Sequence, residues 1–336
     1  MFVFSKLPHK IHRSPPLPSI VSRIHTNIIQ KPKPGDPPNF AAYETLINDA
    51  GRHRDFHSVV SLIRSRWKEG GVNSESTFAF IRNTTRELHA VLRELFGAIS
   101  RLYAGPCRKT AYDALVARLG RLNLVDESLL LTDKVIYRGY GADARTFYPV
   151  LDALTRRRKK NVDRAWDVIR RMKDRGVAPD ETAYAYLLKA YCLSGSLEAA
   201  AGVAAAMEED GVAAGRRTYQ LLVCGACSHG KVEAALAVLR RVEDEGVVLP
   251  LERYAEVIKA LVREGCYEQA MEFVMGCYAG KEKLLDELIF ETLALGLVKA
   301  KKTGEAERVL QEMMKRNLPL CEKLQEFCSQ MRWSAD

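Results

Sequence analysis

The sequence predicts an all-α fold, an α-α superhelix (solenoid) of about eight helix-turn-helix repeats. The first observation is an aromatic residue that recurs at intervals of 34 to 37 residues, and the others are glycine and alanine columns in the same register. The aligned aromatic positions are Tyr43, Phe78, Tyr112, Phe147, Tyr184, Tyr219, Tyr254 and Phe290. A short helical hairpin cannot bury both of its apolar faces alone, so we expect each hairpin to stack on its neighbours.

Two glycine columns predict where the helices of each repeat end. Gly195, Gly230 and Gly265 interrupt apolar runs, which indicates a turn between two helices. The second column follows the downstream helix, where a left-handed C-cap favours glycine. Its members are Gly139, Gly176, Gly211 and Gly246. On the downstream helix, a small residue such as Ala200 is followed at i+7 by a long apolar one such as Met207, which places both on one helical face.

The register divides the chain into three parts. Residues 1–39 precede the first repeat, and residues 322–336 follow the last. The expected repeats are 40–74, 75–108, 109–143, 144–180, 181–215, 216–250, 251–286 and 287–321, which together cover 40–321. The segment 75–108 fits the pattern least well, and 144–180 has two extra residues in its turn. Spacing of i, i+3, i+4 and i+7 after the last repeat predicts a short capping helix. It involves Leu324, Phe327, Cys328 and Met331.

The basic charge of the chain is concentrated before the first repeat. The 336 residues carry a formal charge of +9. Residues 1–35 hold six Lys and Arg and no Asp or Glu, and setting the other 45 basic residues against 42 acidic ones leaves +3. A basic, acid-free leader that ends in a proline-rich linker is typical of a targeting presequence. We expect import into mitochondria, with the chloroplast as the alternative, because four serines in 35 residues are few for a plastid signal.

Composition and motifs favour a non-enzymatic protein without cofactor or metal. No apolar run approaches the 18 residues of a membrane span, so no membrane insertion is expected. The eight cysteines lack the spacing of secreted domains, which fits a reducing compartment. Cys224 and Cys227 form a C-x-x-C without a second pair at zinc-finger spacing, so buried helix positions explain them better than a metal. No catalytic motif and no site for a small-molecule substrate is recognisable.

The segment 181–215 resembles the pentatricopeptide repeat. It has the aromatic at position 4, Gly at 15, Ala at 20, Met at 27 and Gly at 31 of that repeat. The preceding segment ends in Met172-Lys-Asp-Arg-Gly-Val-Ala-Pro-Asp180, which matches the closing pattern of the family. The tetratricopeptide repeat, with a period of 34 residues, is the nearest alternative. The chain is most similar to the pure-repeat class from plant organelles, since neither a deaminase nor a nuclease signature follows the repeats.

This resemblance implies that single-stranded organellar RNA is bound at about one base per repeat. In the family, position 2 sandwiches a base and positions 5 and 35 discriminate it. Position 5 is Glu44, Ala79, Asp113, Tyr148, Ala185, Gln220, Ala255 and Glu291. Position 35 is Ser74, Arg108, Asp143, Asp180, Gly215, Pro250, Leu285 and Cys321. No repeat has a standard pair, so no target sequence is predicted. The alternative function is a scaffold or assembly factor, such as a mitochondrial ribosome-associated subunit, that binds protein or folded RNA.

Charged and aromatic residues at these positions are the candidate RNA contacts. They are Asp113, Asp143, Arg145, Tyr148, Asp180, Arg217 and the basic run Arg156, Arg157, Arg158, Lys159 and Lys160. Arg145 and Arg217, at position 2, are suited to stack on bases and neutralise phosphates. Asp143 and Asp180 precede helices and would cap them, with or without a base contact. The basic run is either a phosphate contact or a solvated turn. Ribosomal or RNA-processing proteins are further expected partners.

Overall fold

A computed structural model describes residues 39–83, 87–156, 162–278 and 282–330 of the chain. Over these ranges the chain forms helices joined by turns, and it contains no strand. It divides into two compact units, the first ending at residue 124 but including 133–141, and the second comprising 125–132 and everything from 142 onward. Helix α6 (Val125–Tyr137) contributes residues to both units. None of the helices in the described ranges is both long enough and apolar enough to cross a membrane.

The first unit begins with an antiparallel helical hairpin. Helices α2 (Phe40–Arg52) and α3 (Phe56–Lys68) form this hairpin. The 3-10 helix η1 (Glu75–Phe78), α4 (Leu88–Ile99) and α5 (Pro106–Arg121) follow it in the same unit. Side-chain caps set where the first two helices start. Asn39 Oδ1 accepts from the backbone N–H of Ala42 at 3.1 Å, and Asp55 Oδ1 accepts from that of Ser58 at 3.0 Å.

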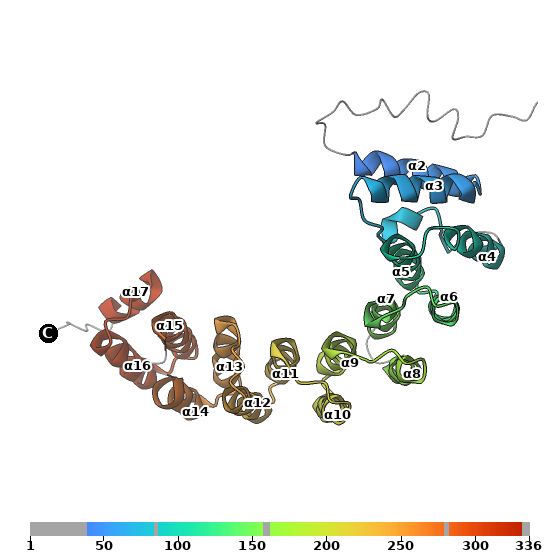
Figure 1. Ribbon diagram of the computed structural model, residues 1–336. Helices are drawn as coiled ribbons and strands as arrows, with labels where there is room; N and C mark the ends of the chain where they lie inside the picture. Colours follow the sequence, from blue (N-terminus) through green and yellow to red (C-terminus); the bar gives the residue numbers. More distant parts are fainter. Residues whose placement is uncertain (1–38, 84–86, 157–161, 279–281, 331–336) are drawn as a thin grey trace, which may run out of the picture. The chain divides into compact units, whose positions relative to one another are not determined.

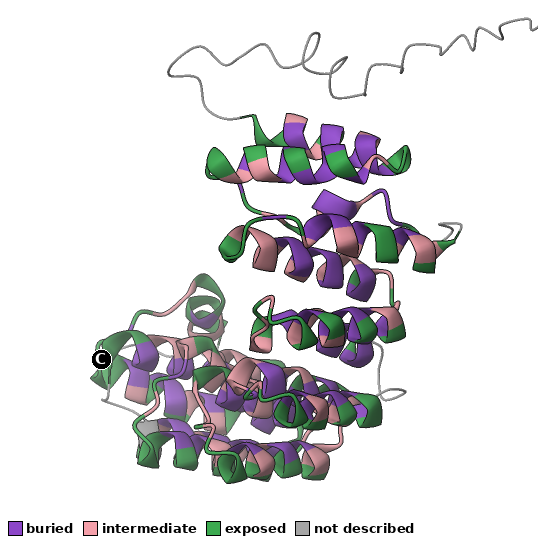
Figure 2. Cartoon of the chain, turned by 45° about the vertical axis from the view of Figure 1, so that its right-hand side comes forward, coloured by how far each residue is buried: buried purple, intermediate pink, exposed green. Residues whose placement is uncertain are grey.

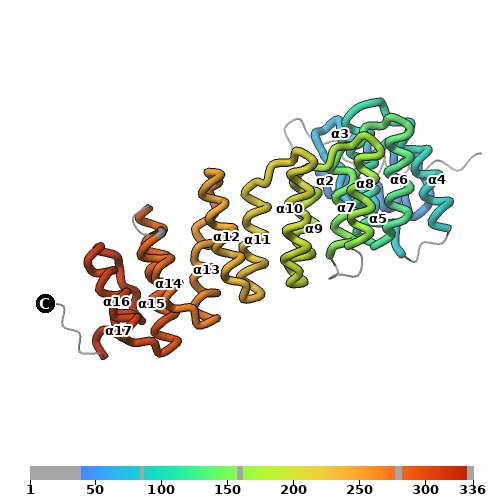
Figure 3. Tube along the Cα trace, turned by 90° about the horizontal axis from the view of Figure 1, so that it is seen from below, coloured from blue at the N-terminus to red at the C-terminus, as the bar shows by residue number. Residues whose placement is uncertain are grey.

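The second unit is a stack of helical hairpins. Its helices are α7 (Ala144–Thr155), α8 (Val162–Asp174), α9 (Glu181–Ser194), α10 (Leu197–Glu209), α11 (Arg216–Ser228), α12 (Val232–Asp244), α13 (Leu251–Arg263), α14 (Tyr267–Met271) with the π-helix η2 (Glu272–Tyr278), α15 (Lys283–Lys299), α16 (Thr303–Lys315) and α17 (Glu322–Gln330). The first helices of successive hairpins, α7, α9, α11, α13 and α15, pack on one another. The second helices form another layer (Figure 1), and helices α9 to α16 lie side by side in Figure 3. This stacking confirms the all-α solenoid class.

The repeated aromatic and alanine columns supply the core of this stack. Phe147, Tyr184, Tyr219 and Phe290 are at most 2% exposed, and Ala200 is fully buried. One continuous apolar cluster runs from α11 to α17, along the buried faces drawn in purple in Figure 2. Leu324 of α17 is fully buried, and Phe327 and Cys328 pack against the same cluster. Helix α17 therefore covers the last hairpin, while Met331 lies outside the described residues.

The second helices end at the predicted glycines, where the backbone φ angle is positive. Gly176 and Gly211 have φ of +72° and +71°. The N–H of the residue after each glycine then donates to the carbonyl oxygen of Met172 or Met207, at 2.9 and 2.8 Å. In the last repeat Asn317 takes the same conformation, with φ of +53°. Asparagine is one of the few residues with a side chain that adopts it readily.

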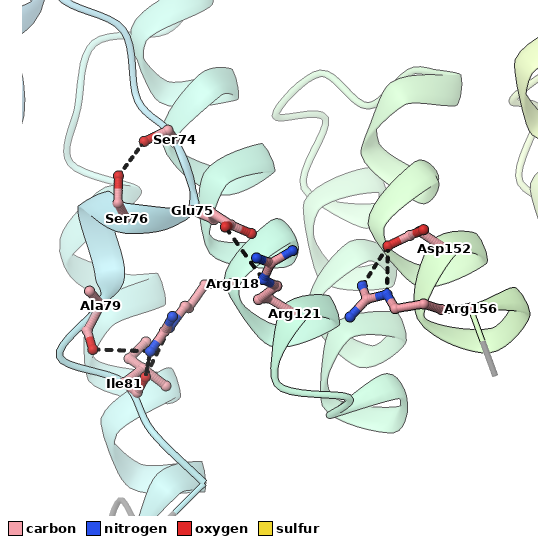
Figure 4. Close-up of polar contacts among 9 residues, drawn as sticks. All are labelled: Ser74, Glu75, Ser76, Ala79, Ile81, Arg118, Arg121, Asp152 and Arg156. Carbon is pink, nitrogen blue, oxygen red and sulfur yellow. Dashed lines mark hydrogen bonds and ion pairs between the residues drawn. The ribbon is translucent and has the colours of Figure 1, made fainter.

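The expected hairpin in 75–108 is wrong in its first half. Of the described residues 75–83, only the four of η1 are helical, and 79–83 are irregular. The segment is rich in Ser, Thr and Asn, whose side chains compete with helical backbone bonds. Other elements supply the missing partners. Asn48 Oδ1 accepts from Phe80 N at 2.7 Å, and Arg118 donates to the carbonyls of Ala79 and Ile81 at 2.7 to 3.1 Å (Figure 4).

Helix starts also differ from two expected repeat boundaries. Helix α5 begins at Pro106, ahead of residue 109, because proline is favoured in the first turn of a helix. Helix α15 begins at Lys283, ahead of residue 287. The two extra residues expected in the turn of 144–180 fall within 157–161, outside the described residues. The division into eight repeats of these lengths stays a prediction.

Candidate nucleic-acid interface

Two tyrosines on neighbouring first helices form the centre of the candidate site. The ring centroids of Tyr148 on α7 and Tyr186 on α9 are 5.9 Å apart, with an interplanar angle of 50°. Both residues are half-buried. Tyr186 comes two residues after the fully buried Tyr184. At 100° per residue it therefore points to the other side of α9. We refer to Tyr148 and Tyr186 as the tyrosine pair.

Asp180 holds one member of the tyrosine pair in place. Its Oδ1 caps α9 by accepting from the N–H of Ala183 at 2.9 Å, and its Oδ2 accepts a hydrogen bond from the Tyr148 hydroxyl. Burial, followed by this hydrogen bond, raises the pKa of Tyr148 to about 12. The phenol thus remains a donor at neutral pH. Positions 5 and 35 of the expected repeat 144–180 are therefore bonded to each other.

Charged side chains surround the other member of the pair. Burial raises the pKa of Tyr186, Asp152 and Asp180 raise it further, and the cation Arg217 opposes them. Arg217 is exposed in the first turn of α11. Asp152 in turn accepts from Arg156, with its Oδ2 at 3.1 Å from Nε and 2.5 Å from Nη2 (Figure 4). Tyr148 and Tyr186 are thus in ring contact, Asp180 accepts a hydrogen bond from Tyr148, and Arg217 is near enough to Tyr186 to lower its pKa.

The other candidate contacts have local partners. Asp143 caps α7 by accepting from the N–H of Arg145 at 3.1 Å. The Arg145 side chain is 80% exposed, and its Nε lies 3.8 Å from Asp143 Oδ2. Asp113, in the first unit, pairs with Lys109 Nζ at 2.6 Å. The remaining members of the basic run, Arg157, Arg158, Lys159 and Lys160, lie outside the described residues.

Carboxylates balance much of the positive charge near this run. The ion pairs are Arg156–Asp152, Arg164–Asp126, Arg170–Asp167 and Lys173–Asp210. All four involve side chains with substantial exposure to solvent. A phosphate would have to compete with these carboxylates for the same cations. Among the described residues, Arg156, Arg164, Arg170 and Lys173 therefore already have carboxylate partners.

A glutamate takes over the capping role where position 35 is glycine. Gly215 has no side chain to cap α11, and Glu181 from α9 does so instead. Its Oε1 accepts from Gly215 N at 3.1 Å, Thr218 N at 3.2 Å and Thr218 Oγ1 at 3.0 Å. Helix α11 thus starts at a carboxylate from the neighbouring hairpin, a contact that sequence reasoning missed.

Sequence reasoning also missed Tyr186 and a cluster around Cys224. A signal for Tyr186 was available in the sequence. It follows Tyr184 of the aromatic column by two residues, which places its ring on the opposite side of the helix. Cys224 Sγ lies 3.3 Å from Glu256 Oε2, and Arg253 Nη1 donates to both, at 2.7 Å to the carboxylate. Cys227 is buried, at 6% exposure. No three His, Cys, Asp or Glu side chains of the described ranges gather as metal ligands would.

Comparison with known proteins finds one family. A family model described as "Pentatricopeptide repeat-containing protein" matches residues 147–275, and one described as "PPR repeat" matches 289–318. Two Arabidopsis thaliana proteins named as mitochondrial pentatricopeptide repeat-containing proteins are similar. At3g56030 is 39% identical over 288 residues, which are 85% of this chain and 81% of that protein. At2g40240 is 40% identical over 285 residues, 85% and 80% of the two chains.

A similar solved structure is that of the pentatricopeptide repeat protein PPR10 in complex with an 18-nt psaJ RNA element. The two sequences are 19% identical, and the TM-score is 0.41. The match covers 90% of this chain and 48% of PPR10, so this chain spans about half the length of that protein.

Proposed function

Because this chain belongs to the pentatricopeptide repeat family, we propose that it binds single-stranded RNA in an organelle. The observation that carries the proposal is the tyrosine pair, Tyr148 and Tyr186, beside the cation Arg217 on adjacent first helices. Half-buried rings offer flat apolar faces on which a base stacks, and a guanidinium neutralises a neighbouring phosphate. Single-stranded RNA presents both groups together, since its bases are free to unstack.

The bond between Tyr148 and Asp180 supports binding by stacking in repeat 144–180. Asp180 already accepts from a helix N–H and from the phenol, so its two oxygens both have protein partners. A base edge would have to compete with these bonds. We propose that this repeat contributes affinity through the rings and contributes little base discrimination, which agrees with the absence of a standard pair at positions 5 and 35.

Occupancy is the proposed mode of action, without catalysis by this chain. A protein that covers a stretch of RNA blocks an exonuclease sterically or keeps a start site unpaired. Stabilisation, processing, splicing or translation of a transcript would follow from that alone. We propose mitochondria as the compartment, supported by the basic leader and by the mitochondrial names of the two relatives, with the chloroplast as the alternative.

Crosslinking in isolated organelles, with sequencing of the protected RNA, tests the proposal. We expect short footprints on one or two transcripts for the full chain. Tyr186→Ala should weaken binding of a footprint RNA about tenfold, since stacking on one aromatic ring contributes roughly 1–3 kcal/mol. Tyr137→Ala is the matched control, because Tyr137 is an 86% exposed tyrosine on α6, outside the tyrosine pair. Equal losses from both variants, or no protected RNA, would contradict the proposal.

The second candidate function is a scaffold or assembly factor, for example one associated with the mitochondrial ribosome. Two observations favour it: the pairing of the α8 cations with carboxylates, and the glutamates Glu44, Glu252 and Glu291 at positions 5 and 2. Those glutamates would repel a polyanion. Cosedimentation with ribosomal particles at high salt, without short footprints, would favour the scaffold over the transcript-binding protein.

A further inference from the structure

Three arginines of the first unit have no carboxylate partner. Arg64 and Arg66 lie on α3, and Arg108 lies in the first turn of α5. None of the three forms an ion pair with an acidic side chain of the described ranges, and the Nε atom of each is buried without a hydrogen-bond partner. Because a buried, unpaired guanidinium costs free energy, this arrangement indicates an anion from outside the chain. We refer to these residues as the arginine cluster.

Arg66 occupies a position that is apolar in other hairpins. It follows the aromatic Tyr43 by 23 residues and is only 3% exposed. The residues at the same spacing after Tyr184, Tyr219 and Phe290 are Met207, Val242 and Met313, all fully buried. The two hydrogen bonds of Arg66 both start at Nη2, and they run to Asn73 Oδ1 and, at 2.9 Å, to Thr77 Oγ1. Both acceptors are neutral, so they leave the charge uncompensated.

The arginine cluster meets at the first turn of α5. Asn73 links Arg66 to that turn, because its Nδ2 donates to Thr110 Oγ1 at 3.1 Å. Burial raises the pKa of Cys107, the second residue of α5, and the charges of Arg64 and Arg66 oppose that shift. Both guanidinium groups are therefore close to the Cys107 thiol. The third arginine belongs to the turn itself.

Aromatic rings position two of the guanidinium groups. Arg64 lies over the ring of Tyr103, 5.3 Å from its centroid, and Arg108 lies over the ring of Tyr140 at 4.2 Å. A contact with a ring face uses no N–H donor, so these groups can still donate to an anion. Tyr103 is 78% exposed, which places this side of the cluster within reach of a solute.

The start of α5 adds backbone donors to the cluster. Its N-cap residue is Gly105, and no side chain accepts from the first N–H groups of this helix of 16 residues. Uncapped N–H groups and the positive end of the helix dipole favour an anion, above all a phosphate. The arginine cluster supplies the opposite charge at the same place.

Glu44 is the acidic side chain nearest in effect to the cluster. Burial lowers the pKa of Arg66, and the charge of Glu44 opposes that shift. No ion pair joins the two within the described ranges, and Glu44 Oε1 is itself buried without a hydrogen-bond partner. Glu44 therefore does not take the place of an external anion.

We propose that the arginine cluster and the start of α5 bind a phosphate group. Guanidinium N–H groups match phosphate oxygens in geometry and charge, and the first N–H groups of α5 complete the site. A free nucleotide and the backbone of an RNA both present this group. The site is built entirely from the first unit, whereas the tyrosine pair belongs to the second. The proposal therefore does not depend on RNA binding by the tyrosine pair.

Equilibrium dialysis of the full chain with radiolabelled inorganic phosphate, at an ionic strength held constant with sodium chloride, tests the proposal. We expect saturable binding, at least about tenfold weaker in Arg66→Met and in Arg64→Gln, because each removes charge-assisted hydrogen bonds. Arg66→Met introduces the residue found at this position in other hairpins, and Thr77 Oγ1 keeps its bond from Ser74 N at 3.0 Å. Lys68→Gln is the matched control, since this exposed residue of α3 follows Arg66 by two positions and faces another side.

A variant with the opposite sign gives a second readout. Glu44→Gln should tighten phosphate binding about two- to fivefold, since it removes a negative charge near Arg66. Tyr186→Ala should leave phosphate binding unchanged. Failure of the phosphate site and failure of RNA binding at the tyrosine pair are thus distinguishable.

Two further titrations identify the source of the phosphate group. Uridine 5′-monophosphate serves as the free nucleotide, and an octauridine without terminal phosphates serves as the RNA. A loss of about tenfold in octauridine affinity on Arg64→Gln would assign the site to backbone phosphates of RNA. A loss confined to uridine 5′-monophosphate would assign it to a free nucleotide.

Three outcomes would overturn the proposal. The first is the absence of saturable phosphate binding to the unmodified chain. The second is phosphate binding that both Arg66→Met and Arg64→Gln retain, or that Lys68→Gln loses equally, since the arginine cluster would then not be the site. The third is acetate that competes as tightly as phosphate, which would make the cluster a carboxylate site for an acidic partner.

Discussion

The phenolic oxygen of Tyr219 lies 2.5 Å from Oε2 of Glu245, the residue that ends the second helix of the same hairpin. The same spacing of 26 residues joins Tyr184 to Asp210 and Tyr43 to Glu69, the last at 2.6 Å. Each bond connects the buried aromatic of a first helix to the end of its second helix. The contact therefore closes the open end of the hairpin.

The contact that each aromatic residue of the column makes depends on which residue lies 26 positions later in the sequence. Phe290 has no hydroxyl, and there the corresponding residue is Arg316, whose guanidinium lies over the Phe290 ring at 5.4 Å from its centroid. Tyr112 has Arg138 at that position, and its hydroxyl donates instead to the carbonyl of Phe96 at 3.0 Å. Tyr43, Tyr184 and Tyr219 thus donate to a carboxylate at this position, and Phe290 accepts a cation on its ring.

A double-mutant cycle should measure the Tyr219–Glu245 contact. Tyr219→Phe is expected to lower the free energy of unfolding by about 1 to 2 kcal/mol, since hydrogen bonds to charged groups are the stronger kind and this carboxylate is partly exposed. In the Tyr219→Phe background, Glu245→Gln should cost about 1 kcal/mol less than alone. Urea unfolding of the four proteins provides the coupling energy. Strict additivity would show that the two groups do not interact.

Acid should weaken the same contacts. Hydrogen bonds lower the pKa values of Asp210 and Glu245. The two hydrogen-bonded carboxylates therefore add to the free energy of unfolding above the ordinary carboxylate pKa, and this addition is lost as pH falls through the lowered pKa values. We expect the Tyr184→Phe/Tyr219→Phe protein to be less stable than the unmodified chain near about pH 7. The gap should narrow by about pH 3. A gap of constant size in urea melts across this range would contradict the assignment.

The cap of α11 by Glu181 predicts that a second substitution restores the stability lost when Glu181 is removed. Glu181→Ala should destabilise the chain by about 1 kcal/mol, because the first N–H groups of α11 lose their acceptor. Gly215→Asp should restore this loss in the Glu181→Ala background by providing a local cap.

In the unmodified chain Gly215→Asp should instead destabilise, since a Cβ there would lie 2.7 Å from Glu181 Oε1. Thermal melts of the three variants check these signs. If Gly215→Asp had the same effect in both backgrounds, Glu181 would not be the cap.

Two neighbouring arginines of α5 should differ in importance. Arg118 donates to backbone carbonyls of the irregular segment after η1, so Arg118→Met is expected to cost about 2 kcal/mol by leaving those carbonyls unpaired. Arg121 makes an exposed ion pair with Glu75 at 3.7 Å, and Arg121→Met should change stability by less than about 0.5 kcal/mol. Chemical unfolding of both variants checks the order, and similar losses would mean that Arg118 acts only through its charge.

The periodicity of the sequence predicted some of these features and could not predict others. The stacking of helical hairpins was expected because the aromatic, glycine and alanine columns recur in one register. The contacts that replace the missing helix in 75–108 could not be predicted in this way, since Arg118 lies 39 residues from Ala79 and no local rule pairs them. Tyr148 and Asp180 were both candidates for RNA contact. Their bond to each other was not foreseen, because it depends on how α7 and α9 pack.

The sequence by itself determined that the chain is a series of stacked helical hairpins and where their second helices end, because helix periodicity and turn glycines act over a few residues. Only the tertiary structure decided which side chains pair between hairpins. Tyr148 with Asp180 and Glu181 with Gly215 pair where neighbouring helices meet. Such contacts depend on distances of a few ångströms between residues more than 30 positions apart, which no local pattern encodes.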